Sequence, residues 1–156
     1  MTDATAFALD ALDQTRRTAG DLLDRLPEAA WTAVPEGFRN HILWNVGHIA
    51  VTADLLTYGL SGLALPSPDW AVAAFRKGTA PADWAAPPSI ADTRALFDTS
   101  LAPLRADLEA GAFSDFLTYR TTPGVVLASV EDAVQFNLFH EGLHTGTIAM
   151  LAALVG

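Results

Sequence analysis

The sequence predicts an all-α protein, a four-helix bundle folded as a single domain over residues 1–156. Alanine and leucine, which favour helices, dominate over β-branched and aromatic residues. Four segments place apolar residues at helical spacing, and proline- and glycine-rich stretches separate them. The length of 156 residues suffices for one hydrophobic core, and four antiparallel helices bury their apolar faces most economically in a bundle.

Proline-containing breaks delimit the first two helices. The first helix is predicted over Asp3–Leu26 and should end before Pro27. The second follows the Pro-Glu-Gly sequence at 35–37, with Asn40 as its N-cap, and should run to Tyr58 before a glycine.

The middle of the chain is richer in helix breakers. A short helix over Asp69–Phe75 is predicted inside the proline- and glycine-rich stretch 61–88. The third long helix should start at Ser89, within a capping-box-like pattern, and end at Gly111. Pro103 is expected to kink or interrupt it.

The last helix follows a segment of β-forming residues. Residues 113–127 surround a Pro123-Gly124 turn, which predicts either an irregular loop or a small hairpin. Ser129 and Asp132 form a second capping-box-like pair, so the last helix should begin there and run to Leu154.

Composition excludes several classes of function. Asp and Glu outnumber Lys and Arg by 18 to 9, and a net charge of −9 repels phosphate backbones, so nucleic acid is not expected as a partner. The absence of cysteine removes disulfides and thiolate ligands. The N-terminus lacks a signal-peptide pattern, and the most apolar run, residues 148–155, is too short for a membrane span. We therefore expect a soluble, cytoplasmic protein with no membrane partner.

The strongest functional signal is a pair of histidines four residues apart, His140 and His144, in the last predicted helix. Residues at this spacing lie one above the other on a helix face, so two imidazoles can bind one metal ion. The same stripe holds Phe136, Asn137 and Leu151 and is expected to be buried. The alternative is that both residues are ordinary core or solvated histidines.

A third histidine, His48, lies in the middle of the second predicted helix. Three imidazoles from two facing helices can hold one divalent ion and leave positions open for water or substrate. His41 lies seven residues before His48, so the two are about 10 Å apart along the helix and are not expected to share an ion. His41 is expected at the mouth of the helix, near the surface or beside the site.

The sequence His140-Glu141-x-x-His144 also satisfies the zincin pattern, in which the glutamate activates zinc-bound water. Zincins usually supply a third ligand downstream, but residues 145–156 contain no His, Asp or Glu. A zincin-type hydrolase is therefore a poor second interpretation, and Glu141 becomes a bystander or a residue beside the site. The acidic residues as a whole are expected on solvated faces. Five aromatic residues are candidates to line a pocket, although core packing is the simpler explanation of each: Trp44, Trp70, Trp84, Phe136 and Phe139.

Two segments resemble those of a known family. The segment Asn40-His41-x-x-Trp44-Asn45-x-Gly47-His48-Ile49 resembles the first-histidine segment of the DinB-like (YfiT-like) metalloenzyme family. The segment Phe136-Asn137-x-Phe139-His140-Glu141-Gly142-Leu143-His144-Thr145-Gly146-x-Ile148 is similar to that family's closing H-x-x-x-H-x-G motif. Helix order and loop placement agree over nearly the whole chain.

The resemblance implies an up-down-down-up four-helix bundle that forms a homodimer. It also implies one divalent metal ion held by His48, His140 and His144. Zinc and nickel are the first expectation for this ion, and iron and manganese the second. Characterised relatives are mostly transferases or isomerases that use low-molecular-weight thiols such as bacillithiol or mycothiol. This chain departs from many relatives at 145–147, where it has Thr-Gly-Thr instead of Arg-Gly-Gln.

The main functional hypothesis is a metal-dependent enzyme that activates a thiol or water to attack a small-molecule substrate, as a thiol-dependent S-transferase or isomerase does. Glu141, Asn45 and His41 are candidates to orient or deprotonate that nucleophile, and the sequence does not choose among them. The alternative is a non-catalytic, dimeric bundle that binds a metal or small ligand. A bundle with structural histidines and no metal is the third hypothesis.

Overall fold

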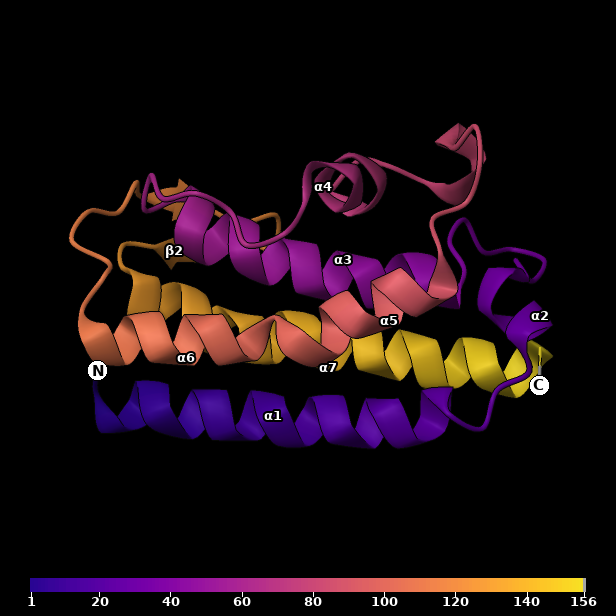
Figure 1. The fold of residues 1–156 in the computed structure, drawn as a ribbon, viewed down its shortest axis with the longest axis horizontal. Helices are drawn as coiled ribbons and strands as arrows, with labels where there is room; N and C mark the ends of the chain where they lie inside the picture. Colours follow the sequence, from indigo (N-terminus) through magenta and orange to yellow (C-terminus); the bar gives the residue numbers. More distant parts are fainter. Residues whose placement is uncertain (156) are drawn as a thin grey trace.

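In the computed structural model, which describes residues 1–155, four long helical segments run side by side along the longest axis (Figure 1). These are α1 (Asp3–Leu23), α3 (Ile42–Asp54), the pair α5 (Ile90–Thr99) and α6 (Leu101–Ala110), and α7 (Val130–Val155). Figure 1 shows α1 and α7 running in one direction, and α3 and the α5–α6 pair in the opposite one. The prediction of an all-α protein is confirmed; Gly156, the last residue of the predicted domain, lies outside the described residues.

The first helix is shorter than predicted and ends ahead of Pro27. α1 ends at Leu23 instead of Leu26. Proline disfavours the helical conformation in the residue before it, so the chain must leave the helix ahead of Pro27. Pro27 then serves as the N-cap of α2 (Glu28–Thr32), a short helix that the sequence analysis did not predict.

The second predicted helix begins one residue later than expected. The N-cap of α3 is His41, whose Nδ1 accepts a hydrogen bond from the backbone N–H of Trp44 at 3.1 Å, and not Asn40. The helical segment continues to Gly59, one residue beyond the predicted end at Tyr58, and its last turn, η1 (Leu55–Gly59), is a π-helix.

A close approach between two helices depends on Gly47. The short helix α4 occupies Asp69–Phe75, as predicted, and lies across α3 (Figure 1). A Cβ atom added at Gly47 would lie only 2.4 Å from the ring of Phe75. Glycine therefore allows α4 to pack directly on α3, next to His48. A 3₁₀ turn, η2 (Pro81–Asp83), follows α4.

The third predicted helix is interrupted, as Pro103 indicates. It divides at Ser100 into α5 and α6, which places Pro103 in the first turn of α6. Proline lacks an N–H, and its ring clashes with the carbonyl four residues earlier, so it is tolerated in a first turn but not in a helix interior. Gly111 ends α6 with a φ of 71°, a left-handed conformation that glycine adopts without strain.

The segment before the last helix forms the small hairpin. β1 (Tyr119–Arg120) pairs antiparallel with β2 (Val126–Leu127) around the predicted Pro123-Gly124 turn. α7 then starts after Ser129, whose Oγ accepts from the backbone N–H of Asp132 at 3.1 Å.

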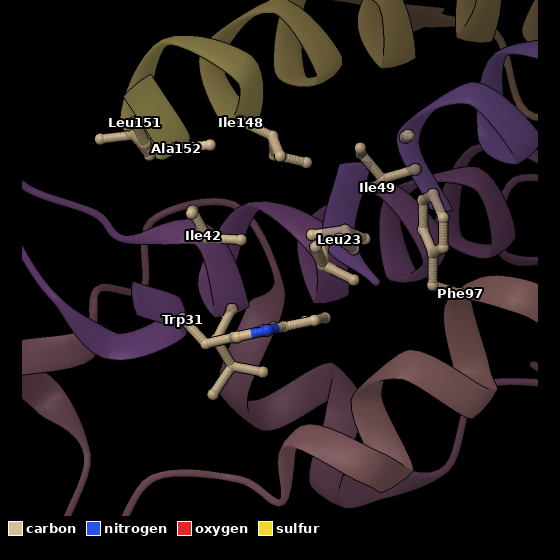
Figure 2. Packing of buried hydrophobic residues seen from close by; sticks show 11 residues of the cluster. Leu23, Trp31, Ile42, Ile49, Phe97, Ile148, Leu151 and Ala152 are labelled. Carbon is tan, nitrogen blue, oxygen red and sulfur yellow. The ribbon is translucent and has the colours of Figure 1, made fainter. Parts of the chain in front are cut away.

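Buried residues from five helices pack between α3 and α7 and hold the two helices together (Figure 2). Ile42 and Ile49 of α3 lie among Leu23 of α1, Phe97 of α5 and Ile148 of α7, and all five are at most 1% exposed. Trp31 of the unpredicted α2 closes the same cluster. Because this core packs against both helices, it fixes the separation and rotation of α3 relative to α7.

The apolar part of α7 extends well beyond residues 148–155, the run that was judged too short for a membrane span. By length and composition alone the helix could cross a membrane, and 22% of its most apolar window is buried. The helix packs against α1 and α3, and its buried face carries the polar side chains of Asn137 and Glu141. It is therefore a helix of a globular domain, with a separate apolar face left exposed.

Candidate metal centre

The structure brings together the three histidines that the sequence singles out. His48 comes from α3, and His140 and His144 come from α7. One nitrogen atom from each lies within 4.8 Å of the others. His48 is buried, and the other two are partly buried.

The separation of two of these nitrogens suits a metal ion. Nε2 of His48 and Nε2 of His140 are 3.3 Å apart. Two ligands about 2.0–2.1 Å from one tetrahedral zinc ion are separated by roughly 3.3–3.4 Å. A direct hydrogen bond between the rings would give a similar distance, so the third ring and the surrounding hydrogen bonds distinguish the two arrangements.

The ring of His48 is oriented by α4. Its Nδ1 lies 2.7 Å from the backbone carbonyl oxygen of Phe75, and a carbonyl can only accept, so Nδ1 carries the proton. Nε2 is left with its lone pair. Trp44 stacks on the same ring with centroids 4.4 Å apart and planes 15° from parallel. Phe75 and Trp44 therefore hold His48 with a free nitrogen directed at the other two histidines.

The ring of His144 is oriented by Asn45, one turn from His48 on α3. His144 Nδ1 lies 2.8 Å from Asn45 Oδ1. The amide nitrogen of Asn45 donates to the backbone carbonyl of His41 at 2.9 Å, which fixes the amide oxygen as the acceptor for His144. His144 therefore also carries its proton on Nδ1 and presents an unprotonated Nε2. Metal-bound histidines almost always have such a partner on the second nitrogen.

His140 lacks this support. Its Nδ1 is buried and has no hydrogen-bond partner among residues 1–155. Its Nε2 faces His48. Because Nε2 of His48 and Nε2 of His144 carry no proton, and one nitrogen of each of the three rings lies within 4.8 Å of the others, a cation satisfies the group better than a third imidazole alone. The donor set and its orientations fit a divalent metal ion.

Burial keeps these imidazoles neutral. It lowers the pKa of His140 to about 3, with further lowering by His144 and His48. It lowers the pKa of His144 to about 4, with a smaller contribution from His48. The pKa of His48 is lowered as well, mainly by burial and against the opposing hydrogen bond to Phe75. Neutral imidazole is the form that binds metal, so no proton has to be displaced at neutral pH.

Glu141, the central residue of the zincin-like pattern, points away from the histidines. Its carboxylate accepts two hydrogen bonds from Arg16 of α1, from Nε at 2.9 Å and Nη2 at 2.7 Å. Arg16 also donates to the carbonyl of Phe97 and to Ser100 Oγ. Glu141 is 1% exposed, so it is not placed to activate a water at the site. The expectation of solvated acidic residues was wrong for Glu141 and for Asp54, which is also 1% exposed.

The predicted buried stripe of α7 was correct only in part. Asn137 and Leu151 are fully buried, but His140 and His144 lie at the edge of the buried face. The centre of that face is taken by Glu141, because the ion pair with Arg16 compensates for burying its charge.

His41 lies at the mouth of α3 as expected but is buried, not at the surface. It is 3% exposed and lies outside the group of three histidines. Burial lowers its pKa to about 4. Its role is to cap α3 through Nδ1 and to receive the amide of Asn45 on its carbonyl oxygen.

A cavity of about 400 Å³ opens beside the three histidines, between α3, α7 and the β1–β2 hairpin. Of the predicted pocket aromatics, Phe136 and Phe139 line it and Trp44 stacks on His48. Trp70 and Trp84 line a different cavity, next to α4. Lys77 and Tyr119, which were not predicted from the sequence, also line the cavity beside the histidines. The signal for Lys77 was that it is the only lysine in the chain.

Most of the chain matches the model of a known family. The family model of the DinB superfamily matches residues 11–148, which include all three histidines. A search of curated proteins gives no match to the chain.

Proposed function

Because the chain belongs to the DinB superfamily, we propose that it binds one divalent metal ion through His48, His140 and His144 and uses it to activate a small nucleophile. One observation carries this proposal. Phe75 and Asn45 fix the protons of two of the three imidazoles on Nδ1, which leaves their Nε2 atoms unprotonated in a close group of three histidines that lines a cavity. Three histidines with open positions are typical of catalytic metal sites.

Zinc or nickel is the proposed ion, with iron or manganese as the alternatives. Three neutral imidazoles suit any of these metals, and no carboxylate among residues 1–155 joins the group to favour a harder ion. When bound, the ion would lower the pKa of a thiol or a water molecule and so supply a nucleophile at neutral pH.

We propose that the nucleophile is a low-molecular-weight thiol and that the reaction is an S-transfer or an isomerisation. The resemblance to thiol-dependent DinB-like enzymes supports this, as does a cavity large enough for a small substrate. The protein's own side chains and backbone orient the histidine rings and shape the cavity. Asn45 and the Phe75 carbonyl hold two rings, and Phe136 and Leu143 form an apolar part of the cavity wall.

The second candidate function is a non-catalytic bundle that binds a metal or a small ligand. It is favoured by the lack of an acidic side chain on the described walls of the cavity, which leaves only Lys77 and Tyr119 as titratable groups besides the three histidines. Glu141 cannot take the role of general base while Arg16 holds both of its oxygens.

We also propose that the helices form the up-down-down-up bundle of the family and that two copies associate through α7. Beyond the cavity, two large apolar side chains lie on one exposed stripe of this helix: Met150 and Leu154, which are 48% and 57% exposed. Gly146 lies on the same stripe, with open space where a Cβ would be. Exposed apolar patches of this kind mark interaction surfaces, and small residues let two helices approach closely.

Metal analysis of purified variants tests the proposal. The wild-type protein, loaded with zinc or nickel and desalted, should retain about one ion per chain, and His140→Ala and His144→Ala should each lose it. His41→Asn is the matched control, because asparagine is a good N-cap and His41 is outside the group. Loss of metal from His41→Asn equal to that from His140→Ala, or no metal in the wild type, would overturn the metal site.

Activity separates the two candidate functions. Metal-loaded protein is mixed with a panel of low-molecular-weight thiols and electrophilic or epoxide substrates, and thiol consumption is followed. Turnover that is lost in His144→Ala supports the enzyme. Metal binding without turnover across the panel favours the binding module.

A further inference from the structure

The charge of the cavity beside the histidines differs from that of the whole chain. The protein carries 18 acidic and 9 basic residues, yet no acidic residue is found among the described residues that line this cavity. Its one permanently charged side chain is Lys77. Such a cavity favours anionic ligands, because no carboxylate on its walls neutralises the ammonium group of Lys77.

Lys77 is placed to meet a ligand. It follows α4 and is exposed, and its Nζ donates to Thr122 Oγ1 of the hairpin turn at 2.7 Å. Both residues line the cavity, so this hydrogen bond holds the ammonium at the mouth. An ammonium has three donors, and Lys77 forms no ion pair within the described chain. Arg16, Arg94 and Arg105 are each paired with carboxylates, and the other described arginines, which form no ion pair, do not line the cavity.

The walls between Lys77 and the histidines are apolar. Leu56, Phe136, Phe139 and Leu143 line the cavity, and the last two are more than half exposed. An apolar ligand body would remove this surface from water, which is favourable in proportion to the area covered. The remaining polar groups are neutral hydroxyls of threonine and tyrosine side chains.

We infer that the cavity takes an amphiphilic carboxylate, whose apolar body lies against Phe136, Phe139 and Leu143 and whose carboxylate is bound by Lys77. If the proposed function holds, this carboxylate is the substrate, and its reacting group lies toward the three histidines. Only this assignment rests on the proposed function. The contact between Lys77 and the carboxylate requires no metal.

Two matched probes test the inference on the full chain. Octanoate and octanamide have the same apolar body and nearly the same size, but only octanoate is charged. Both are titrated into chelator-treated, metal-free protein, so that the anion cannot bind to a metal ion. The wild type should bind octanoate about two- to fivefold more tightly, the range of an ion pair at a solvent-accessible position. Lysine labelled with ¹³C at Cε gives a single signal, because the chain has one lysine; octanoate should shift it more than octanamide does.

Three variants identify the cation responsible. Lys77→Gln should bind the two probes equally, and Lys77→Arg should keep the preference for octanoate. Arg76→Gln is the charge-matched control, because Arg76 is the exposed neighbour that does not line the cavity. The inference is overturned if the wild type does not distinguish the probes, if neither binds, or if Arg76→Gln loses the preference as Lys77→Gln does.

Metal content, measured separately on the same proteins, keeps this inference distinct from the proposed function. Retained metal with no preference for octanoate rejects the carboxylate inference and leaves the metal site standing. Absence of bound metal with a preference that depends on Lys77 rejects the metal site and leaves the inference standing.

Discussion

Asn45 of α3 and His144 of α7 meet across the two helices, with His144 Nδ1 2.8 Å from Asn45 Oδ1. This contact fixes which nitrogen of His144 is available to a ligand. It also joins the first-histidine segment to the closing motif through a pair of side chains next to the proposed metal ion.

Removing this contact should weaken metal binding. Asn45→Ala should raise the zinc dissociation constant about 10- to 100-fold, the usual effect of losing a partner that orients a metal ligand. Asn45→Asp keeps an acceptor for His144 and should retain most of the affinity. Isothermal titration with zinc measures both variants, and an Asn45→Ala affinity equal to that of the wild type would show that the contact does not orient a ligand.

The ion pair between Arg16 and Glu141 should matter for stability and not for chemistry. Glu141→Gln leaves the buried guanidinium without its countercharge and should lower the free energy of unfolding by roughly 3–5 kcal/mol. The double variant Arg16→Met/Glu141→Leu removes both charges and should be less destabilised than Glu141→Gln. Urea unfolding at pH 7 measures both. If Glu141→Gln left the free energy of unfolding unchanged, the ion pair would have no structural role.

Gly47 should be essential for the packing of α4. An alanine there would place Cβ 2.4 Å from the Phe75 ring, so α4 must move and the Phe75 carbonyl must shift from His48 Nδ1. Gly47→Ala should cost about 1–3 kcal/mol of stability, as overpacking does, and should also weaken zinc binding. Gly142→Ala is the control, since open space surrounds that exposed helical position; it should be neutral or stabilising by about 0.5–1 kcal/mol. Similar losses in the two variants would contradict this account.

The metal-free protein should lose stability in mild acid. The ordinary histidine pKa is 6.5, and burial lowers it to about 3 in His140 and about 4 in His144. Below pH 6.5 the unfolded chain binds protons that the folded chain does not, so the free energy of unfolding falls as pH drops from 6.5 towards 4. His140→Gln should make this slope less steep, by at most about 1.4 kcal/mol per pH unit.

Urea unfolding at several pH values measures both slopes. Burial raises the pKa of Asp54, so Asp54 changes the free energy of unfolding with pH in the opposite direction. It is present in both proteins and therefore does not affect the difference between their slopes. Identical slopes would mean that His140 is not held neutral by its surroundings.

The exposed stripe of α7 should mediate self-association. Replacing Met150 and Leu154 by glutamate puts charges on the proposed contact surface and should convert a dimer to a monomer in sedimentation experiments. Val126→Glu is the control, because Val126 is similarly exposed but lies on β2. A wild type that sediments as a monomer would reject the dimer.

The sequence was most informative where a local rule applies. Pro103 predicted the break between α5 and α6, and Ser129 predicted the start of α7, because each acts on its own turn. The start of α3 was placed at Asn40 because asparagine is the stronger N-cap by propensity. The side chain of His41 takes that role in the structure.

The site could be predicted as a set of residues but not as a cavity. Spacing and resemblance singled out His48, His140 and His144, and the structure brings them together. Glu141 could not be placed, because its orientation depends on Arg16, a residue 125 positions away in the sequence. Lys77 was missed for the same reason, since its position at the cavity depends on a hydrogen bond to a hairpin turn that the sequence left undecided.

X-ray absorption spectroscopy of the zinc-loaded protein tests the central claim most directly. If His48, His140 and His144 hold the ion, the first coordination shell contains three imidazole nitrogens at about 2.0–2.1 Å, and one of these is lost in His48→Ala. A first shell with fewer than three imidazoles, or one that His48→Ala leaves unchanged, would contradict the account.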